Sequence, residues 1–306
     1  MEGPQIAVVK PQRLRPGDTL GIVAPAGPYD SDQLSQGVSV LESLGYTIKI
    51  PEDLCRPHGF LAGTDLQRAA FVNAFFADKD VKGIICARGG YGSMRILDLL
   101  DYEVIHTNPK VFAGFSDITA LHSVINNRCG LVTFHSPVVT YLGKAGASTI
   151  QSLSSGIASV HPVEIVLKEA EILQKGKAVG RVCGGNLRTL CHLIGTPYAP
   201  DFTDGLLLLE EVNESPYRLD RMLFQMRMAG CFDRVRGVML GAFEACGDMN
   251  SVFSVVRSIF EELNIPVLAG FDIGHGSTNL TLPLGLPATL DTDRKSLVFQ
   301  ETATRP

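Results

Sequence analysis

Two hydrophobic patterns alternate along the first half of the chain. Short apolar runs bounded by turn residues predict buried strands at residues 18–24, 46–50, 81–87, 111–115 and 131–134. Between these runs, apolar residues recur at helical spacing and predict helices at residues 32–44, 65–77, 93–100 and 118–127. Thr64 is a suitable N-cap for the second of these helices. Strands and helices alternating at this spacing indicate right-handed βαβ units, so we predict an α/β fold with a parallel sheet.

The pattern changes in the second half. Ala, Ser, Gly and Lys dominate between residues 143 and 180, and the alternation lapses there. Further on, strands are predicted at residues 205–210 and 237–242, helices at 216–229 and 251–263, and short strands within 280–300. We therefore expect an N-terminal α/β domain over residues 1–150, a linker region over 151–175 and a C-terminal domain over 176–306.

Composition narrows the possible classes of function. Hydrophobic residues make up 45% of the 306 residues, which suffices for one large or two medium cores and excludes a disordered chain. The chain has 32 Asp and Glu residues and 27 Lys and Arg residues, so its net charge is −5. A mildly acidic chain has no bulk attraction to polyanions, so we expect neither nucleic acid nor a membrane surface as a partner.

The cysteines and the start of the chain bear on the compartment. The seven cysteines lie far apart, without a C-x-x-C pair or a histidine at zinc-ligand spacing, so reduced thiols are favoured and we expect no metal or cofactor. No apolar run approaches the length of a membrane span, and the first ten residues lack a basic segment followed by an apolar stretch. We therefore expect a cytoplasmic protein.

The sharpest candidate for chemistry is the hexapeptide Gly114–Thr119 (GFSDIT), where a predicted strand turns into a predicted helix. A serine at such a turn exposes its Oγ beside the free backbone N–H groups of a helix N-terminus, as a nucleophile with an oxyanion hole requires. The match to the G-x-S-x-G elbow is partial, because Ile118 replaces the second glycine. On the hexapeptide alone, helix capping by Ser116 or Asp117 is the favoured interpretation.

A glycine-rich segment, Arg88–Ser93 (RGGYGS), also joins a predicted strand to a predicted helix. Its glycines let the backbone approach a ligand closely and can turn amides toward an anion. The segment nevertheless fits neither the P-loop nor the dinucleotide-binding pattern. A tight turn without a ligand role is an equally good explanation.

An acid and a base are available in the second half. Glu210 and Glu211 end a leucine-rich strand, where a carboxylate can orient a histidine, although most such acids are solvated or paired with a nearby arginine. His275 is the only histidine between two glycines, so a partner can reach its ring. Ser116, Glu210 and His275 then supply a nucleophile, an acid and a base in the chain order of an α/β-hydrolase, with the site expected at a domain interface.

These segments together resemble the LD-carboxypeptidases of peptidase family S66, the muramoyltetrapeptide carboxypeptidases and their relatives. The resemblance covers nearly the whole chain, at residues 14–18 (LRPGD), 23–25 (VAP), 87–93 (ARGGYGS), 114–121 (GFSDITAL), 134–137 (FHSP), 184–187 (GGNL), 209–214 (LEEVNE), 217–223 (YRLDRML) and 274–285, which ends in LPLG. Each motif alone is weak, whereas the combination is highly specific.

The resemblance implies a serine peptidase that uses no metal. The serine of G-F-S-D is the family's nucleophile, the first Glu after the leucine-rich strand is its acid and the His of the G-H segment is its base. Carried over, these residues are Ser116, Glu210 and His275. Glu211 is the alternative acid, because adjacent residues of a strand face opposite sides.

The resemblance also implies how the rest of the site is built. The expected oxyanion donors are the backbone N–H of Asp117 and one N–H of the glycine loop, which we assign to Gly90. The substrate's carboxylates need cationic or amide partners. Arg88 and Tyr91 are the candidate substrate contacts, and for Arg88 bracing of the glycine loop is an equally good explanation.

The family fold is a Rossmann-like N-terminal domain and a smaller C-terminal domain with a small β-barrel or sheet, usually paired as homodimers. By resemblance we expect a homodimer that removes the terminal D-Ala from murein tetrapeptides, at the L,D bond after the diamino acid, in the recycling of cell-wall peptides.

Three other functions fit parts of the pattern. A microcin C immunity-type peptidase cleaves aminoacyl-nucleotide conjugates, but members of that branch stack an aromatic residue, typically tryptophan, on the adenine, and this chain has no tryptophan. A general ester or amide hydrolase is the second. A non-catalytic muropeptide-binding protein is the third, and it would not need Ser116, Glu210 and His275 together, so an intact triad argues against it.

Overall fold

A computed structural model describes residues 7–306, and the chain divides into two compact units. The first unit holds the chain up to Val160 together with Leu280–Gly285 and Ala303–Pro306, and the second holds His161–Asn279 and Leu286–Thr302. The expectation about a leader segment rests on the first ten residues, and residues 1–6 of these lie outside the described part of the chain. No helix in the described part of the chain combines the length and apolar character needed to cross a bilayer.

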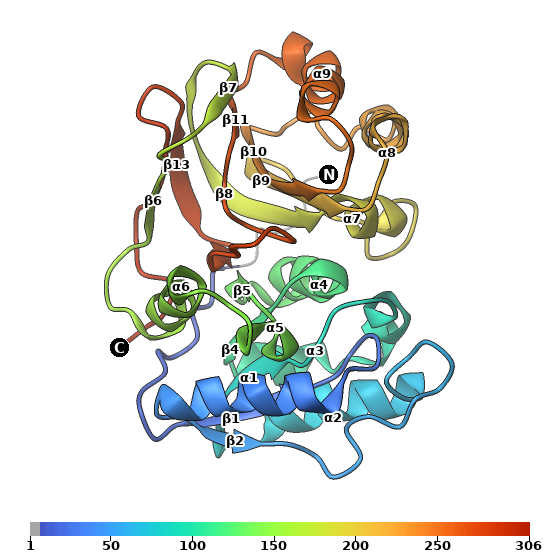
Figure 1. The fold of residues 1–306 in the computed structure, drawn as a ribbon, viewed down its shortest axis with the longest axis vertical. Helices are drawn as coiled ribbons and strands as arrows, with labels where there is room; N and C mark the ends of the chain where they lie inside the picture. The colour runs from blue at the N-terminus through green and yellow to red at the C-terminus, as the bar shows by residue number, and fades with distance from the viewer. Residues whose placement is uncertain (1–6) are drawn as a thin grey trace. The chain divides into compact units, whose positions relative to one another are not determined.

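The first unit is built on a six-stranded sheet with the order β12-β5-β4-β3-β1-β2. Figure 1 labels β1, β2, β4 and β5 of this sheet. The strands are β1 (Thr19–Val23), β2 (Thr47–Lys49), β3 (Val81–Cys86), β4 (Val111–Gly114), β5 (Thr133–His135) and β12 (Leu282–Leu284). All neighbours pair in parallel except β12, which runs antiparallel to β5. The carboxyl ends of β1, β3 and β4 therefore meet at one edge, where ligands of parallel sheets bind.

The helices of the first unit follow the strands in the predicted alternation. They are α1 (Ser31–Ser43), α2 (Asp65–Ala77), α3 (Tyr102–Thr107), α4 (Thr119–Cys129), α5 (Val139–Leu142) and α6 (Ala147–Ala158), with 3₁₀ helices at Ser93–Leu99 and Ser116–Ile118. The Thr64 cap is confirmed, because its Oγ1 accepts from the Gln67 amide at 3.2 Å. The helix predicted at residues 93–100 is wrong in type, since Ser93–Leu99 is a 3₁₀ helix.

The second unit is built on an eight-stranded sheet with the order β6-β14-β13-β8-β9-β10-β11-β7. Its strands are β6 (Glu164–Val166), β7 (Glu171–Gln174), β8 (Lys177–Asn186), β9 (Gly205–Val212), β10 (Gly237–Glu244), β11 (Val267–Ala269), β13 (Pro287–Asp291) and β14 (Ser296–Phe299). The central strands β8 to β11 are parallel and the outer ones antiparallel. The predicted fold class, a parallel-sheet first part and a sheet-rich second part, is confirmed.

The core of the second unit determines which way the residues of β9 point. Leu207 and Leu209 pack in one apolar cluster with side chains of α7 (Leu187–Leu193), α8 (Pro216–Met228) and α9 (Met249–Phe260). Successive strand residues alternate between the two faces of a sheet. Glu211 therefore follows Leu209 toward the helices, whereas Glu210 points to the other face.

Candidate active site

The backbone bends sharply at Ser116, directly after β4. Ser116 begins a 3₁₀ turn that runs into α4, and its φ of 65° lies in the left-handed region. A non-glycine residue pays a conformational cost there, and such strain is concentrated at functional sites. The half-buried Ser116 thus has the backbone geometry of a strand-to-helix nucleophile turn, although Ile118 takes the place of the usual glycine.

The glycine loop after β3 packs directly against this turn. A Cβ added to Gly89 would lie 2.8 Å from the Cβ of Ser116 and 3.1 Å from its Oγ, so no larger residue fits without displacing the serine. Gly90 and Gly92 have φ values of 104° and 124°, which side chains of L-residues rarely allow. The glycines of this loop therefore serve a close backbone approach to Ser116.

Two backbone N–H groups near Ser116 have no acceptor within residues 7–306. They belong to Gly90 in the glycine loop and to Asp117 at the start of the 3₁₀ turn. Both were predicted as oxyanion donors. Amides left without an acceptor beside a serine are suited to an anionic oxygen, because they lose no protein hydrogen bond when it forms.

The side chain of Asp117 links the nucleophile turn to the end of the glycine loop. Its Oδ2 accepts from the Ser93 amide at 2.8 Å and from the Ser93 Oγ at 2.6 Å, and the Ser93 hydroxyl also contacts the Asp117 carbonyl. Both side chains are buried. The capping alternative is wrong, because neither the 3₁₀ turn at Ser116 nor α4 has a side-chain cap, and the Asp117 carboxylate instead accepts from Ser93 of the neighbouring 3₁₀ helix.

Arg88 and Tyr91, the predicted substrate contacts, both lie on the exposed side of the glycine loop. Arg88 donates through Nη1 to the Pro28 carbonyl at 2.6 Å, and the Gly27 amide donates to the Gly89 carbonyl at 3.1 Å. These bonds tie the loop to the turn after β1, which supports the bracing role weighed for Arg88. The half-exposed Tyr91 packs on the ring of Phe60, edge to face at 5.3 Å between centroids, and also interacts with the side chain of Arg95.

In the second unit, Glu210 and His275 form a hydrogen-bonded pair. Glu210 Oε2 lies 2.6 Å from His275 Nδ1, and the carboxylate is fully buried near the end of β9. A Cβ at Gly274 would overlap Glu210 Oε2, so the glycine before the histidine lets the loop close over the carboxylate. The Asn279 side chain accepts from the Gly274 amide at 2.9 Å and holds this loop in place.

The electrostatics of the pair make the imidazole more basic. Burial of the ring acts to lower the pKa of His275, but the hydrogen bond and charge of Glu210, with the charge of Glu211, outweigh it and raise the pKa above its ordinary value. With Nδ1 facing the carboxylate, Nε2 is the nitrogen left to exchange a proton. A carboxylate that fixes the tautomer and makes the ring more basic is what a general base requires.

Glu211, the alternative acid, has different partners. It accepts from Asn186 Nδ2 at 3.0 Å, from the Arg188 amide at 2.8 Å and from the Arg188 guanidinium at 3.3 Å. Arg188 in turn lies 3.3 Å from Glu214. The carboxylate on His275 is that of Glu210, while Glu211 fastens the start of α7 to β9.

Arg68, which was not among the candidate residues predicted from the sequence, binds the carbonyl at the end of the glycine loop. Its side chain is 1% exposed and contacts three backbone carbonyls. A signal was available, because Arg68 shares a helical face with the apolar Val72 and Phe75. A charged residue on the buried stripe of a helix needs dedicated partners.

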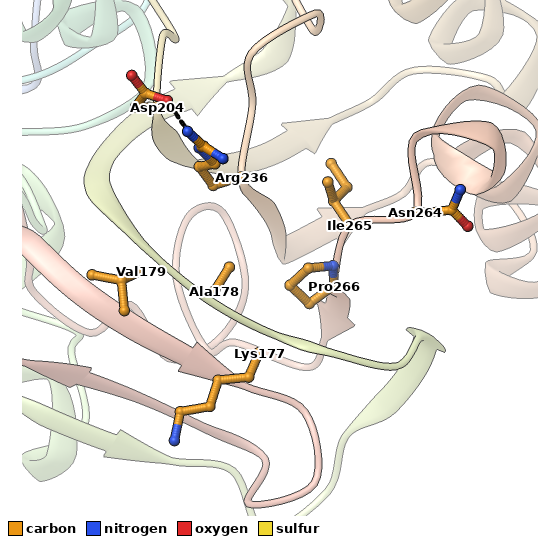
Figure 2. Close-up of a pocket in the computed structure, with 8 residues that line it drawn as sticks. All are labelled: Lys177, Ala178, Val179, Asp204, Arg236, Asn264, Ile265 and Pro266. Atoms are coloured by element: carbon orange, nitrogen blue, oxygen red, sulfur yellow. Dashed lines mark hydrogen bonds and ion pairs between the residues drawn. The ribbon is translucent and has the colours of Figure 1, made fainter.

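A cavity of about 400 Å³ lies elsewhere in the second unit (Figure 2). Lys177, Asp204, Arg236 and Pro266 are among its lining residues, and Asp204 pairs with Arg236 at 2.7 Å. These residues stand at or just before the starts of β8 to β11, whereas Glu210 lies near the carboxyl end of β9. The cavity is therefore at the opposite edge of the sheet from the Glu210–His275 pair.

Within residues 7–306 no group of His, Cys, Asp and Glu is arranged to hold a metal ion.

Two family models match the chain. The model of the LD-carboxypeptidase N-terminal domain matches residues 20–136, and that of the LD-carboxypeptidase C-terminal domain matches residues 179–290. Ser116 and the glycine loop fall in the first match, and Glu210 and His275 fall in the second.

Individual relatives cover nearly all of the chain. A probable murein peptide carboxypeptidase of Bacillus subtilis is 36% identical over 95% of this chain and 94% of its own length. A murein tetrapeptide carboxypeptidase of Pseudomonas aeruginosa is 31% identical over 90% of this chain and 94% of its own length. The solved structure of MccF in complex with glutamyl sulfamoyl guanosine has a TM-score of 0.90 at 26% identity, over 97% of this chain and 99% of that one.

Proposed function

Because the chain belongs to the LD-carboxypeptidase family, we propose that it is a serine peptidase that removes the terminal D-alanine from murein tetrapeptides. The bond cleaved is the L,D bond after the diamino acid, and the substrates are peptides released by turnover of the cell wall. The relatives from Bacillus subtilis and Pseudomonas aeruginosa, both named as murein peptide or tetrapeptide carboxypeptidases, support this substrate class. Assembly as a homodimer, implied by the resemblance, is part of the proposal.

The observation that carries the proposed chemistry is the 2.6 Å hydrogen bond between Glu210 and His275. A solvated acid or a structural histidine would not need a fully buried carboxylate held against one ring nitrogen. The left-handed φ of Ser116 supplies the complementary feature, a serine whose backbone is strained at a strand-to-helix turn. Acid, base and nucleophile are the three parts of a serine peptidase.

In the proposed reaction, His275 Nε2 takes the proton of Ser116 as Oγ attacks the carbonyl carbon of the L-configured centre. The tetrahedral oxyanion accepts hydrogen bonds from the amides of Gly90 and Asp117. The C–N bond then breaks, and D-alanine leaves with the proton returned by His275. Water, deprotonated by the same imidazole, attacks the carbonyl carbon of the acyl-enzyme. The ester bond to Ser116 then breaks, Ser116 Oγ takes the proton back from His275, and the tripeptide is released. Each oxyanion donor is worth about 3 kcal/mol of the barrier in measured cases.

The experiment incubates the purified protein with L-Ala-γ-D-Glu-meso-diaminopimelate-D-Ala and follows free D-alanine by mass spectrometry. We expect one D-alanine and one tripeptide per turnover. The same peptide ending in L-alanine is the matched control for the L,D bond, and the pentapeptide tests whether cleavage is confined to the terminal residue. No D-alanine from the tetrapeptide at micromolar enzyme would contradict the substrate assignment.

A second candidate follows from the likeness to MccF. Its structure was solved with glutamyl sulfamoyl guanosine, an aminoacyl-nucleotide analogue, and its TM-score to this chain is 0.90. Two observations stand against this candidate. The MccF self-immunity protein of Escherichia coli is 28% identical to this chain, compared with 36% and 31% for the murein relatives, and the chain has no tryptophan for stacking on a base. Glutamyl sulfamoyl adenosine belongs in the same substrate panel, and faster hydrolysis of it than of the tetrapeptide would favour the MccF-type function.

A further inference from the structure

The first unit contains a guanidinium that is removed from water and used entirely for internal hydrogen bonds. Arg68 lies in the first turn of α2, and its side chain is 1% exposed. Its Nε donates to the Gly63 carbonyl at 3.2 Å, and its Nη1 donates to the carbonyls of Gly92, at 2.9 Å, and Pro25. Its Nη2 pairs with Asp65 at 2.5 Å. Burying a charge is unfavourable unless it is paired and hydrogen-bonded, and Arg68 meets both conditions.

The carbonyls held by Arg68 belong to three different segments at the carboxyl edge of the sheet. Pro25 follows β1, Gly92 ends the glycine loop after β3, and Gly63 precedes the N-cap of α2. Only a planar fork with several donors in fixed directions can hold three carbonyls and a carboxylate at once. A lysine at this position would keep the charge but lose the fork.

The glycine loop needs such external restraints. Gly90 and Gly92 both have left-handed φ values, and glycine backbones have the widest conformational freedom. The loop is held at its start by the bond from Gly27 to Gly89 and just after its end by the bonds between Ser93 and Asp117. Arg68 contacts the carbonyl of Gly92, two residues after the Gly90 amide.

We propose that Arg68 is a positioning residue for the reaction: by holding the carbonyls of Gly92 and Pro25, it keeps the Gly90 amide aimed at the oxyanion beside Ser116. This inference rests on the proposed serine peptidase function. Arg68 touches no reacting atom, and its effect is expected on the transition state more than on substrate binding, because the Gly90 amide acts only once negative charge develops.

The other end of α2 offers a matched control. Lys110 is also buried, at 8% exposure, and its Nζ donates to the Phe75 carbonyl at 2.6 Å and contacts the Asp78 carbonyl. Lys110 immediately precedes β4 and thus lies at the amino edge of the sheet, away from the glycine loop. Arg68→Ala and Lys110→Met therefore each remove one buried cation that binds carbonyls at an end of α2, but only the first removes it beside the glycine loop.

The test compares these variants by kcat and KM for D-alanine release and by the affinity for a peptidyl boronic acid, which forms a tetrahedral adduct with a serine. The rate of Ser116 labelling by a fluorophosphonate is measured as well, because it does not depend on the natural substrate. Thermal unfolding reports on stability.

We expect Arg68→Ala to lower kcat about 10²-fold, to weaken boronate binding by a similar factor and to leave KM nearly unchanged. Added guanidinium ion should restore part of kcat, and Lys110→Met should lower the melting temperature while kcat stays at the wild-type level.

If Arg68→Ala does not fold, Arg68→Lys takes its place with the same expected split between kcat and KM. Wild-type kcat and boronate affinity in a folded Arg68 variant would overturn the proposal, as would a loss of kcat equal to that of Lys110→Met. The substrate assignment can fail separately. In that case wild type releases no D-alanine, and the comparison of labelling rates between wild type and Arg68→Ala still supports or overturns the positioning role.

Discussion

The regions around Ser116 and around the Glu210–His275 pair are built by different means. At Ser116 the backbone itself carries the geometry, through a left-handed φ, a glycine packed against the serine and two amides without an acceptor in the described chain. At His275 the orientation of the ring depends instead on a side-chain hydrogen bond to a fully buried carboxylate. The first region should therefore be sensitive to added atoms, and the second to the removal of charge.

The two regions share one feature of placement. Each lies at the carboxyl ends of parallel strands of its own sheet, Ser116 after β4 and Glu210 near the end of β9. Loops at that edge can vary without disturbing the sheet, because the strands beneath them are already paired. The difference in construction is therefore local, and point substitutions can test it.

The largest effect is expected from removing the charge of Glu210. In Glu210→Gln the side chain keeps its size but no longer selects the tautomer or stabilises the imidazolium, so kcat should fall by about 10³- to 10⁴-fold. Steady-state release of D-alanine measures this, and the melting temperature verifies the fold. A loss of less than tenfold would show that Glu210 is not the acid of the proposed triad.

A methyl group at Gly89 should come next. The added Cβ would lie 2.8 Å from the Cβ of Ser116, so Gly89→Ala must displace the serine, and we expect kcat to fall about 10²-fold. Gly146→Ala is the matched control, because Gly146 has no atom within 4 Å of an added Cβ and a φ of −69°. Equal activity of the two variants would contradict the close packing of the glycine loop on the nucleophile turn.

The pH profile should report the raised pKa of His275. The base must be neutral to accept a proton, so kcat/KM should fall as the pH drops through this pKa, with a midpoint above the ordinary histidine value of 6.5. In Glu210→Gln the charge of Glu210 and its hydrogen bond as a carboxylate are lost, while burial and the charge of Glu211 persist, so the pKa of His275 and the midpoint should move to lower pH. A midpoint at or below 6.5 in wild type would contradict the coupling between Glu210 and His275.

The smallest effect on catalysis is expected at Glu211. Glu211→Gln weakens the contacts with Arg188 and its amide, which should cost about 1–2 kcal/mol of the free energy of unfolding and leave kcat within a fewfold of wild type. The ion pair is half exposed at Arg188, which limits the cost. Urea denaturation measures the effect on stability, and the rate of D-alanine release measures the effect on kcat. A loss of kcat as large as that of Glu210→Gln would reverse the assignment of the two carboxylates.

Much of this arrangement could be predicted from the sequence, where periodicity and caps are local signals. The bounds of α2 are confirmed in full, and the five predicted strands of the first unit are present within a few residues. The short helix α3 (Tyr102–Thr107) was missed because six residues are too few to show a helical period. The helix α6 lies in the Ser- and Gly-rich stretch where the alternation lapses, and its stability comes from packing that composition does not show.

The choice between Glu210 and Glu211 could not be made from the sequence. Alternation shows only that the two side chains face opposite sides, and which side holds His275 depends on the apolar cluster that Leu207 and Leu209 form with the helices. The helical pattern places Arg68 on the buried face of α2, but it does not identify the partners of Arg68, since the carbonyls of residues 25, 63 and 92 are brought together only by the fold. Local pattern predicts elements and candidate residues, whereas partners distant in sequence require the tertiary structure.

The central claim is that Ser116 is a nucleophile activated by His275, and covalent labelling tests it most directly. The protein is treated with a fluorophosphonate probe, and the modified residue is located by peptide mass spectrometry, with Ser116→Ala and His275→Ala as companions. We expect one adduct on Ser116 in wild type, none in Ser116→Ala and strongly slowed labelling in His275→Ala. Stoichiometric labelling of another residue, or labelling of Ser116 at the wild-type rate without His275, would contradict it.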